Sequence, residues 1–413
     1  MASIQLRILQ LVYFNGCFFT GFSIMDDSDD VVVVLPSDFT TSYPKKRRRT
    51  NVIPHDVIEI DEDVMILDVK VGTSNKGKEI LTEYNDISVN QVKPAQSRKK
   101  PASTPRENSL QAIYAREMEE DKDGLLKKYR LFKRFDTVGD YSDHHYAHRG
   151  SKAKQPPKNW AKVIQQEWKI LEKDLPDTIS VRVYEERMDL LRAVIVGAAG
   201  TPYQDGLFFF DVFFPSNYPN VPPNVYYHSG GLRLNPNLYE CGKVCLSLLN
   251  TWSGSKEEKW TPKKSTMLQV LLSIQALVLN AKPYFNEPGW ASMAGTAEGE
   301  KRAQPYHENI FILSCRTMLF SLRKPPKHFE DYVAGHFRAR AQAILLACKA
   351  YMEGANVGCL AEGGVQDIDE SDKSCSHNFK QQVGSIVKPL VDGFVKNGSN
   401  KEFCKQLLPK VKV

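Results

Sequence analysis

The period of the apolar positions changes along the chain and predicts where the helices and strands lie. The first regular stretch has apolar residues three and four positions apart, which is the period of one buried helix face: Trp160, Val163, Ile164, Trp168 and Leu171. Runs rich in β-branched and aromatic residues follow at 179–186, 190–198, 206–215 and 224–228. Between the last two runs, four prolines within residues 215–223 exclude a regular ladder. The pattern predicts a helix followed by a four-stranded antiparallel meander.

Apolar positions return to the helical period in the later part of the chain. The stretch 259–280 has a stripe that we expect to be buried: Met267, Val270, Leu271, Ile274 and Leu277. In this stretch Thr261 is the predicted cap and Pro262 the first helical residue. Further helices are expected at 305–322 and 329–352, and the remaining tail is polar and Gly-rich with only a weak helical pattern. Because strands come before most of the helices, we predict an α+β fold.

The N-terminal part lacks a sustained period. We therefore divide the chain into a disordered region at 1–105, a charged helical linker at 106–155, a folded domain at 156–325, and a helical extension with a flexible tail at 326–413. Three histidines in the linker, His144, His145 and His148, have no matching carboxylate or cysteine cluster. A solvated loop is the favoured interpretation of that segment, over a metal site.

Composition narrows the class of protein. In 413 residues, 42% are hydrophobic and the net charge is +6, which provides for a core but argues against a dedicated nucleic-acid binder. Eight cysteines without a repeated spacing favour a reduced, intracellular protein. The apolar stretch Leu6–Phe22 is too short and interrupted for a membrane span, and we expect no membrane partner. Met25, which acidic residues follow directly, is an alternative start to Met1.

The segment "NPNLYECGKVCLSLLNTW", residues 235–252, contains the candidate chemistry. Cys241 and Cys245 are four positions apart, but no second pair lies at a usable spacing for a metal site. A buried cysteine is a common alternative, since a free thiol behaves as a small hydrophobe. The polar, turn-rich residues before Cys245 instead favour a position at the surface and a role as a nucleophile.

A cysteine hydrolase would need an imidazole base, and neither His228 nor His307 is placed by a motif. A cysteine that accepts an already activated acyl group needs no resident base, because thiol and thioester exchange is nearly balanced. The later attack by an amine passes through an oxyanion, which an asparagine amide can stabilise. Asn237, eight residues before Cys245, is the candidate donor.

Residues from about 159 to 323 resemble the catalytic domain of ubiquitin-conjugating enzymes. The matching pieces occur in the family's order: the helix from Trp160 to Leu171, "GTPYQDGLFFFDVFFPSNYPNVPP", the Pro-Asn pair before "VCLSLL", and "WTP" leading into "LLSIQAL". The resemblance is closest to large members with long flanking regions, including plant ones. It implies the ubiquitin-conjugating fold, with disordered regions on either side of it.

The resemblance also implies roles for individual residues. Cys245 matches the cysteine that forms the thioester, and Asn237 matches the asparagine that stabilises the oxyanion or orders the nearby loop. Asn235 replaces a mainly structural histidine, which affects local packing more than chemistry. Glu287 lies near the acidic residue that orients the incoming lysine, although the surrounding loop departs from the family pattern. Cys241 is a bystander.

Partners and cofactors follow from the same resemblance. Ubiquitin, the ubiquitin-activating enzyme and ubiquitin ligases are the expected partners, with no metal or other cofactor. The long loop Asn250–Trp260 beside the cysteine is expected to touch the substrate or to gate access to the thiol. The reaction requires the Cys245 sulfur to be open to a macromolecular acyl donor. The alternative functions are a catalytically silent scaffold and a SUMO-directed adaptor.

Two kinds of motif lie in the N-terminal region. The apolar runs Val31–Leu35 and Val57–Ile60, each beside acidic residues, resemble SUMO-interacting motifs that would add a strand to a partner's sheet. The basic cluster Pro44–Thr50 resembles a nuclear import signal, so we expect a nuclear or cytoplasmic protein.

Overall fold

A computed structural model describes residues 124–149, 157–358 and 374–406. The expected disorder of 1–105, the SUMO-interacting runs, the basic cluster and the alternative start at Met25 lie outside the described residues. They stay predictions, as do the boundaries of the four regions.

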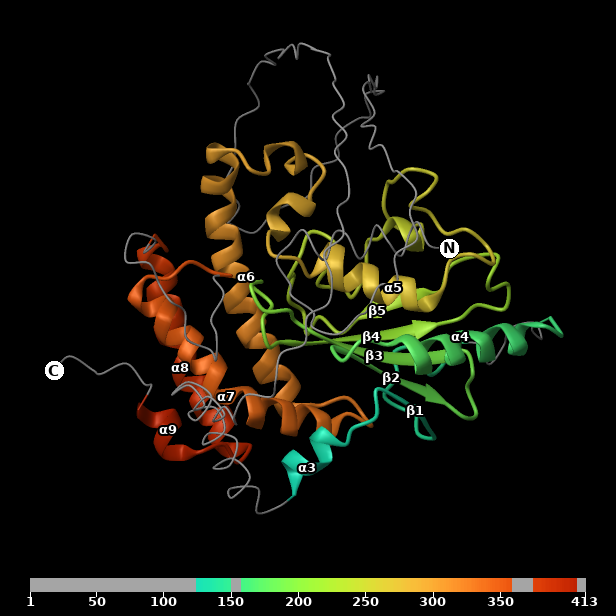
Figure 1. The fold of residues 1–413 in the computed structure, drawn as a ribbon, viewed down its shortest axis with the longest axis horizontal. Coiled ribbons are helices and arrows are strands. Elements are labelled where there is room, and N and C mark those ends of the chain that lie inside the picture. Colours follow the sequence, from blue (N-terminus) through green and yellow to red (C-terminus); the bar gives the residue numbers. More distant parts are fainter. Residues whose placement is uncertain (1–123, 150–156, 359–373, 407–413) are drawn as a thin grey trace, which may run out of the picture. The chain divides into compact units, whose positions relative to one another are not determined.

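The centre of the fold is a five-stranded sheet with the strands in chain order (Figure 1). The strands are β1 (Phe135–Val138), β2 (Ile179–Tyr184), β3 (Leu190–Val196), β4 (Leu207–Phe213) and β5 (Asn224–Tyr227). From β2 to β5 all pairs are antiparallel, which confirms the predicted four-stranded meander. β1 adds a fifth strand, parallel to β2, within the segment that we predicted to be a helical linker.

Helices flank the sheet. They are α3 (Leu125–Arg130), α4 (Trp160–Asp174), α5 (Met267–Ser273), α6 (Ala297–Arg323), α7 (Glu330–Glu353), α8 (His377–Lys396) and α9 (Lys401–Gln406). A π turn, η2 (Ile274–Val278), continues α5, and single 3-10 turns lie at η1 (Ser247–Leu249), η3 (Pro283–Asn286) and η4 (Ala291–Met293). The α+β class is therefore confirmed.

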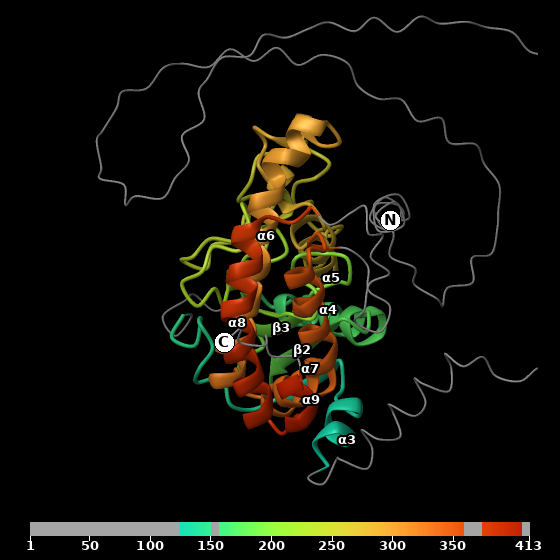
Figure 2. The same ribbon diagram turned by 90° about the vertical axis from the view of Figure 1, so that its left-hand side faces the viewer.

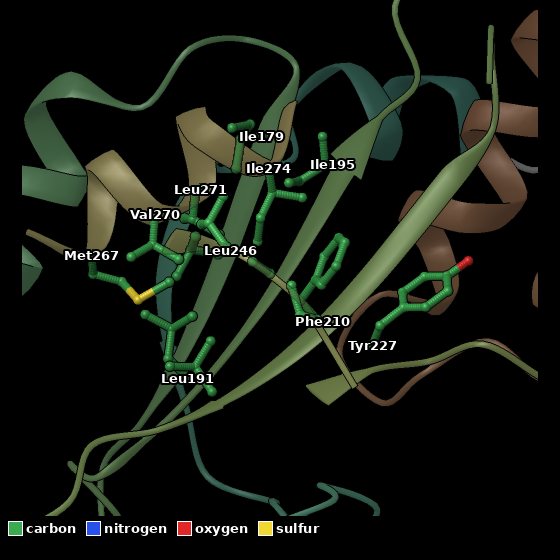
Figure 3. Packing of buried hydrophobic residues seen from close by; sticks show 14 of the residues in the cluster. Ile179, Leu191, Ile195, Phe210, Tyr227, Leu246, Met267, Val270, Leu271 and Ile274 are labelled. Carbon is green, nitrogen blue, oxygen red and sulfur yellow. The ribbon is translucent and has the colours of Figure 1, made fainter. Parts of the chain in front are cut away.

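Alternate residues of the strands point to opposite faces, and both faces are buried. One face packs against α4 and α5 in the larger apolar cluster (Figure 3). In that view Met267, Val270 and Ile274 of α5 and η2 lie over Leu191 and Phe210 of the sheet. The predicted helix face of α4 belongs to the same cluster, with Ile164 and Leu171 fully buried.

The second face of the sheet packs against the C-terminal helices. Val194, Leu207 and Phe209 belong to one apolar cluster with residues of α6, α7 and α8. These three helices lie side by side in both views (Figures 1 and 2) and contact one another. The prediction of a flexible tail is wrong for α8, because Phe379, Val383 and Val387 and the rest of that helix face are buried in this cluster. The sheet thus separates two apolar cores, each of which packs against one of its faces.

A buried ionic cluster joins the second face to residues 140–149. The Arg192 guanidinium donates to Asp211 Oδ1 at 2.6 Å and to Asp143 Oδ1 at 2.8 Å. Next to it His144 is 3% exposed, and its Nε2 lies 3.1 Å from the carbonyl oxygen of Leu191. The solvated-loop interpretation of the histidine segment is therefore wrong for His144, because the sheet encloses it.

The helix at α5 differs from its prediction at both ends. Thr266 rather than Thr261 caps it, in a capping box with Gln269. At the other end the π turn adds a residue to the hydrogen-bonded ring, with Leu279 N–H donating to Ile274 O at 3.0 Å. The extra residue rotates the apolar face. Leu277, expected in the core, is 41% exposed, and Val278 is buried in its place.

Candidate active site

Cys245 follows a tight hairpin that is attached to the sheet edge. Single bridges pair Leu238 with Val244 and Tyr226 of β5 with Lys243. At the hairpin turn Gly242 has a φ of 87°, and a Cβ there would meet the Tyr226 ring at 2.0 Å. Glycine is therefore required for the hairpin to lie this close to β5.

The Cys245 side chain is directed away from the core but is covered. Its neighbours Val244 and Leu246 both belong to the larger apolar cluster, and Leu246 is extended, so Cys245 lies on the opposite side of the segment. Cys245 nevertheless is 1% exposed. The expectation that its sulfur is open to a macromolecular donor is wrong for this conformation, and a cover must move before such a donor reaches it.

The ring of Tyr239 lies near Cys245, and its hydroxyl acts to lower the pKa of the Cys245 thiol. This ring lies between two exposed cations: the Arg233 guanidinium carbon is 4.3 Å from its centroid and Lys243 Nζ is 5.5 Å away. Burial raises the pKa of the Cys245 thiol, while Lys243, the Tyr239 hydroxyl and Arg233 act in the opposite direction. The thiol is thus protonated at neutral pH in the covered state.

Asn237 is brought against Cys245, as predicted, and orders its backbone. Asn237 Nδ2 donates to Cys245 O at 2.9 Å, and Cys245 N–H donates to Asn237 O at 2.8 Å. Asn237 is 7% exposed, and its Oδ1 is buried without a hydrogen-bond partner. One amide hydrogen of Nδ2 remains beyond the bond to Cys245 O. The side chain can therefore hold the loop and still offer a donor beside the cysteine.

Asn235, where the family has histidine, fills its site with a complete set of hydrogen bonds. Its Nδ2 donates to Val278 O at 2.7 Å and to the Tyr203 hydroxyl at 2.8 Å. Its Oδ1 accepts from Asn237 N–H at 2.8 Å and from Asn286 Nδ2 at 3.3 Å. Asn235 is fully buried. The Asn235 side chain thus connects the cysteine segment to η2, which continues α5, and to η3.

Glu287 is half-buried and directly follows η3. Asn286, the last residue of η3, donates a hydrogen bond to Asn235. Burial raises the pKa of Tyr306; Arg233 lowers it and Glu287 raises it further. Arg233 also acts to lower the pKa of the Cys245 thiol. The orienting role of Glu287 stays a prediction.

Sequence reasoning missed Tyr239, Arg233 and Asn286 as parts of this site. Tyr239 lies within the candidate segment, but only the hairpin shows that it comes close to Cys245. Asn286 comes from a distant part of the chain, and no local pattern marks it.

Within the described part of the chain, no three His, Cys, Asp or Glu side chains are grouped so as to hold a metal ion. Among the helices that the structure describes, none is both long and apolar enough to cross a membrane.

Comparison with known proteins places this site in a family context. The profile of the family "Ubiquitin-conjugating enzyme" matches residues 163–311. The chain is 62% identical over 269 residues to probable ubiquitin-conjugating enzyme E2 26 of Arabidopsis thaliana, covering 65% of this chain and 50% of that protein. It thus spans about half the length of that relative.

Two further relatives are similar over different shares of their length. Putative ubiquitin-conjugating enzyme E2 38 of Arabidopsis thaliana is 59% identical over 282 residues, covering 68% of this chain and 86% of that protein. The human dual E2 ubiquitin-conjugating enzyme/E3 ubiquitin-protein ligase BIRC6 is 42% identical over 200 residues, covering 46% of this chain and 4% of that protein.

Proposed function

The chain belongs to the ubiquitin-conjugating enzyme family, and we propose that it accepts ubiquitin as a thioester on Cys245 and transfers it to a substrate lysine. The observation that carries the proposal is the placement of Cys245. Its neighbours are buried in the core on one side, while its own side chain lies on the other side among half-buried and exposed residues.

The two transfers follow from this placement. In the first, the Cys245 sulfur attacks the C-terminal carbonyl carbon of ubiquitin, which arrives as a thioester on the activating enzyme. A new C–S bond forms, and the activating enzyme's cysteine leaves as a thiolate that takes up the proton released by Cys245. In the second, a lysine amine attacks the same carbon, an amide bond forms, and Cys245 leaves as the thiolate, which takes up the proton that the amine nitrogen loses.

Asn237 supports both steps in this proposal. One Nδ2 hydrogen keeps the Cys245 carbonyl in place, and the other is the donor to the oxyanion that forms at the ubiquitin carbonyl. Arg233 and Lys243 favour the departing thiolate, because both act to lower the pKa of the Cys245 thiol. Glu287 is proposed to orient the incoming lysine.

The proposal is tested by charging the full chain with activating enzyme, ubiquitin and ATP and separating the products on a non-reducing gel. We expect an adduct that reductant removes. Cys245→Ala should give none, and Cys245→Ser should give at most an ester that resists reductant. Cys241→Ser is the matched control, since Cys241 is an exposed cysteine of the same hairpin, and it should charge like the wild type. An adduct on Cys245→Ala would refute the assignment.

Ligase-independent transfer is a second property that the same assay tests. The relative BIRC6 is named both a conjugating enzyme and a ligase, and the long flanks of this chain leave room for substrate selection. We propose that self-modification in the absence of a ligase accompanies charging. In the described residues nothing favours a silent scaffold. The SUMO-directed adaptor and the nuclear localisation depend on residues outside the described part.

A further inference from the structure

The hydroxyl of Thr251 contacts the backbone on both sides of Cys245. It donates to Val244 O at 2.7 Å and accepts from Leu246 N–H at 3.0 Å. Thr251 N–H also donates to Leu246 O, at 3.3 Å. Cys245 therefore lies between two residues whose backbone groups are held by one side chain.

The chain reaches this arrangement by folding back on itself after Cys245. The 3-10 turn η1 follows directly, and Asn250 then adopts a left-handed conformation with a φ of 56°. Asparagine tolerates this conformation better than most residues. The reversal returns Thr251 to the start of the turn, where its hydroxyl contacts the backbone on both sides of Cys245.

The opposite side of Cys245 is held by Asn237, which bonds both its N–H and its carbonyl oxygen. Asn237 and Thr251 together fix four consecutive backbone groups, from Val244 O to Leu246 N–H. Thr251 is also the second residue of the long loop beside the cysteine. The Thr251 hydroxyl thus both anchors this loop and holds the backbone on either side of the reactive cysteine.

We propose that Thr251 is a positioning residue for Cys245, whose hydroxyl fixes the reactive cysteine through its two neighbours and couples it to the loop 250–260. The role deepens the proposed function and rests on it. The transfer requires the incoming amine nitrogen to approach the carbonyl carbon of the Cys245 thioester to about 3 Å, and a misplacement of about 1 Å costs up to about 100-fold in rate. Thr251 acts on the rate of transfer in this proposal, with no contact to the substrate.

The test compares Thr251→Val, which keeps the shape but removes the hydroxyl, with Thr251→Ser, which keeps the hydroxyl. Ser247→Ala is the matched control: it removes a different hydrogen bond to this loop, from Ser247 Oγ to Ser253 O at 3.1 Å, and leaves the contacts of Thr251 in place. Because Thr251 is exposed, the valine is expected to fold. If it does not, Thr251→Ala takes its place.

Discharge of the preformed Cys245 thioester to free lysine is measured at increasing lysine concentration. We expect Thr251→Val to lower the maximal rate by about 10- to 100-fold with an unchanged half-saturating lysine concentration. Thr251→Ser and Ser247→Ala should stay within about threefold of wild type. Equal rates for valine and wild type, or equal losses in valine and serine, would overturn the proposal.

Amide hydrogen exchange at Leu246 provides a second readout that needs no ubiquitin. Exchange should be at least about tenfold faster in Thr251→Val than in Thr251→Ser, since the Leu246 N–H loses its acceptor. Failure of the proposed function is recognised separately, because the wild type itself would then form no adduct. If the wild type forms the adduct but Leu246 N–H exchanges equally fast in Thr251→Val and Thr251→Ser, the positioning role alone is overturned.

Discussion

Asn235→Ala should destabilise the protein by about 2.5 to 4.5 kcal/mol, because the side chain is the centre of a buried hydrogen-bond network. Three of its four partners keep another bond after the truncation. Val278 O still accepts from Asn286 Nδ2 at 3.1 Å, and the Tyr203 hydroxyl still donates to Leu234 O at 2.9 Å. Asn237 N–H loses its acceptor, at 2.8 Å, in a buried position.

The magnitude follows from these contacts. A buried N–H left without a partner costs about 1–3 kcal/mol, and each of the three lost bonds to a partner that keeps another adds about 0.5 kcal/mol, the lower end of the net value of a hydrogen bond. Burial of Asn235 leaves water little access to replace the lost acceptor. For a folded region of this size, a loss of this order corresponds to roughly 5 to 15 °C in the unfolding midpoint.

Urea unfolding followed by circular dichroism measures the loss, with Asn217→Ala, at an exposed asparagine, as the control. The control should change the free energy of unfolding by less than about 0.5 kcal/mol. If Asn235→Ala changes the free energy of unfolding by no more than the control does, with the same slope against urea concentration, the network does not stabilise the protein. The hydrogen bonds of Asn235 then do not explain how it fills this site.

Three further predictions concern pH, access and truncation. Burial lowers the pKa of His144 to about 4, so the unfolded chain takes up a proton below pH about 6.5 before the folded chain does. The contribution of neutral His144 to the free energy of unfolding is therefore complete above pH 6.5 and is lost as the pH falls toward 4. The unfolding midpoint should depend less on pH in His144→Gln. Tyr239→Ala should speed alkylation of Cys245 by iodoacetamide about 10- to 100-fold at constant pH, and an unchanged rate would remove Tyr239 as a cover. A chain that ends at residue 325 should aggregate or unfold at lower urea than the full chain, because it exposes the sheet face covered by α7 and α8.

The sequence was sufficient for those elements whose apolar period is strong and local. The face of α4 was predictable because its apolar residues recur three and four positions apart, and the four strands of the meander because they are dense β-branched runs. The segment of Cys245 and Asn237 was predictable because both residues lie within eight positions of one another.

The elements that the sequence did not predict depend on contacts with distant residues. β1 has four residues of mixed character, and it is a strand because it pairs with β2, with Val181 N–H donating to Arg134 O at 2.6 Å. α8 contains Pro389 and two glycines, which resemble helix breakers, and its buried face is held by α6 and α7. The burial of His144 depends on its contacts with the face of the sheet, beside Leu191 and Asp211.

The covered sulfur of Cys245 is compatible with acyl transfer because the cover and the support of this residue are different groups. The backbone from Val244 to Leu246 is fixed by Asn237 and Thr251, so exposure of the sulfur through backbone motion would break several hydrogen bonds at once. The Tyr239 ring, in contrast, lies against two exposed cations, Arg233 and Lys243. Exposed cation–π contacts contribute about 0.5–1 kcal/mol each. Rotation of this side chain then costs about 1–2 kcal/mol, which leaves roughly one molecule in ten open. A fraction of this order suffices for a docked donor to capture the thiol, while the backbone that positions it stays in place.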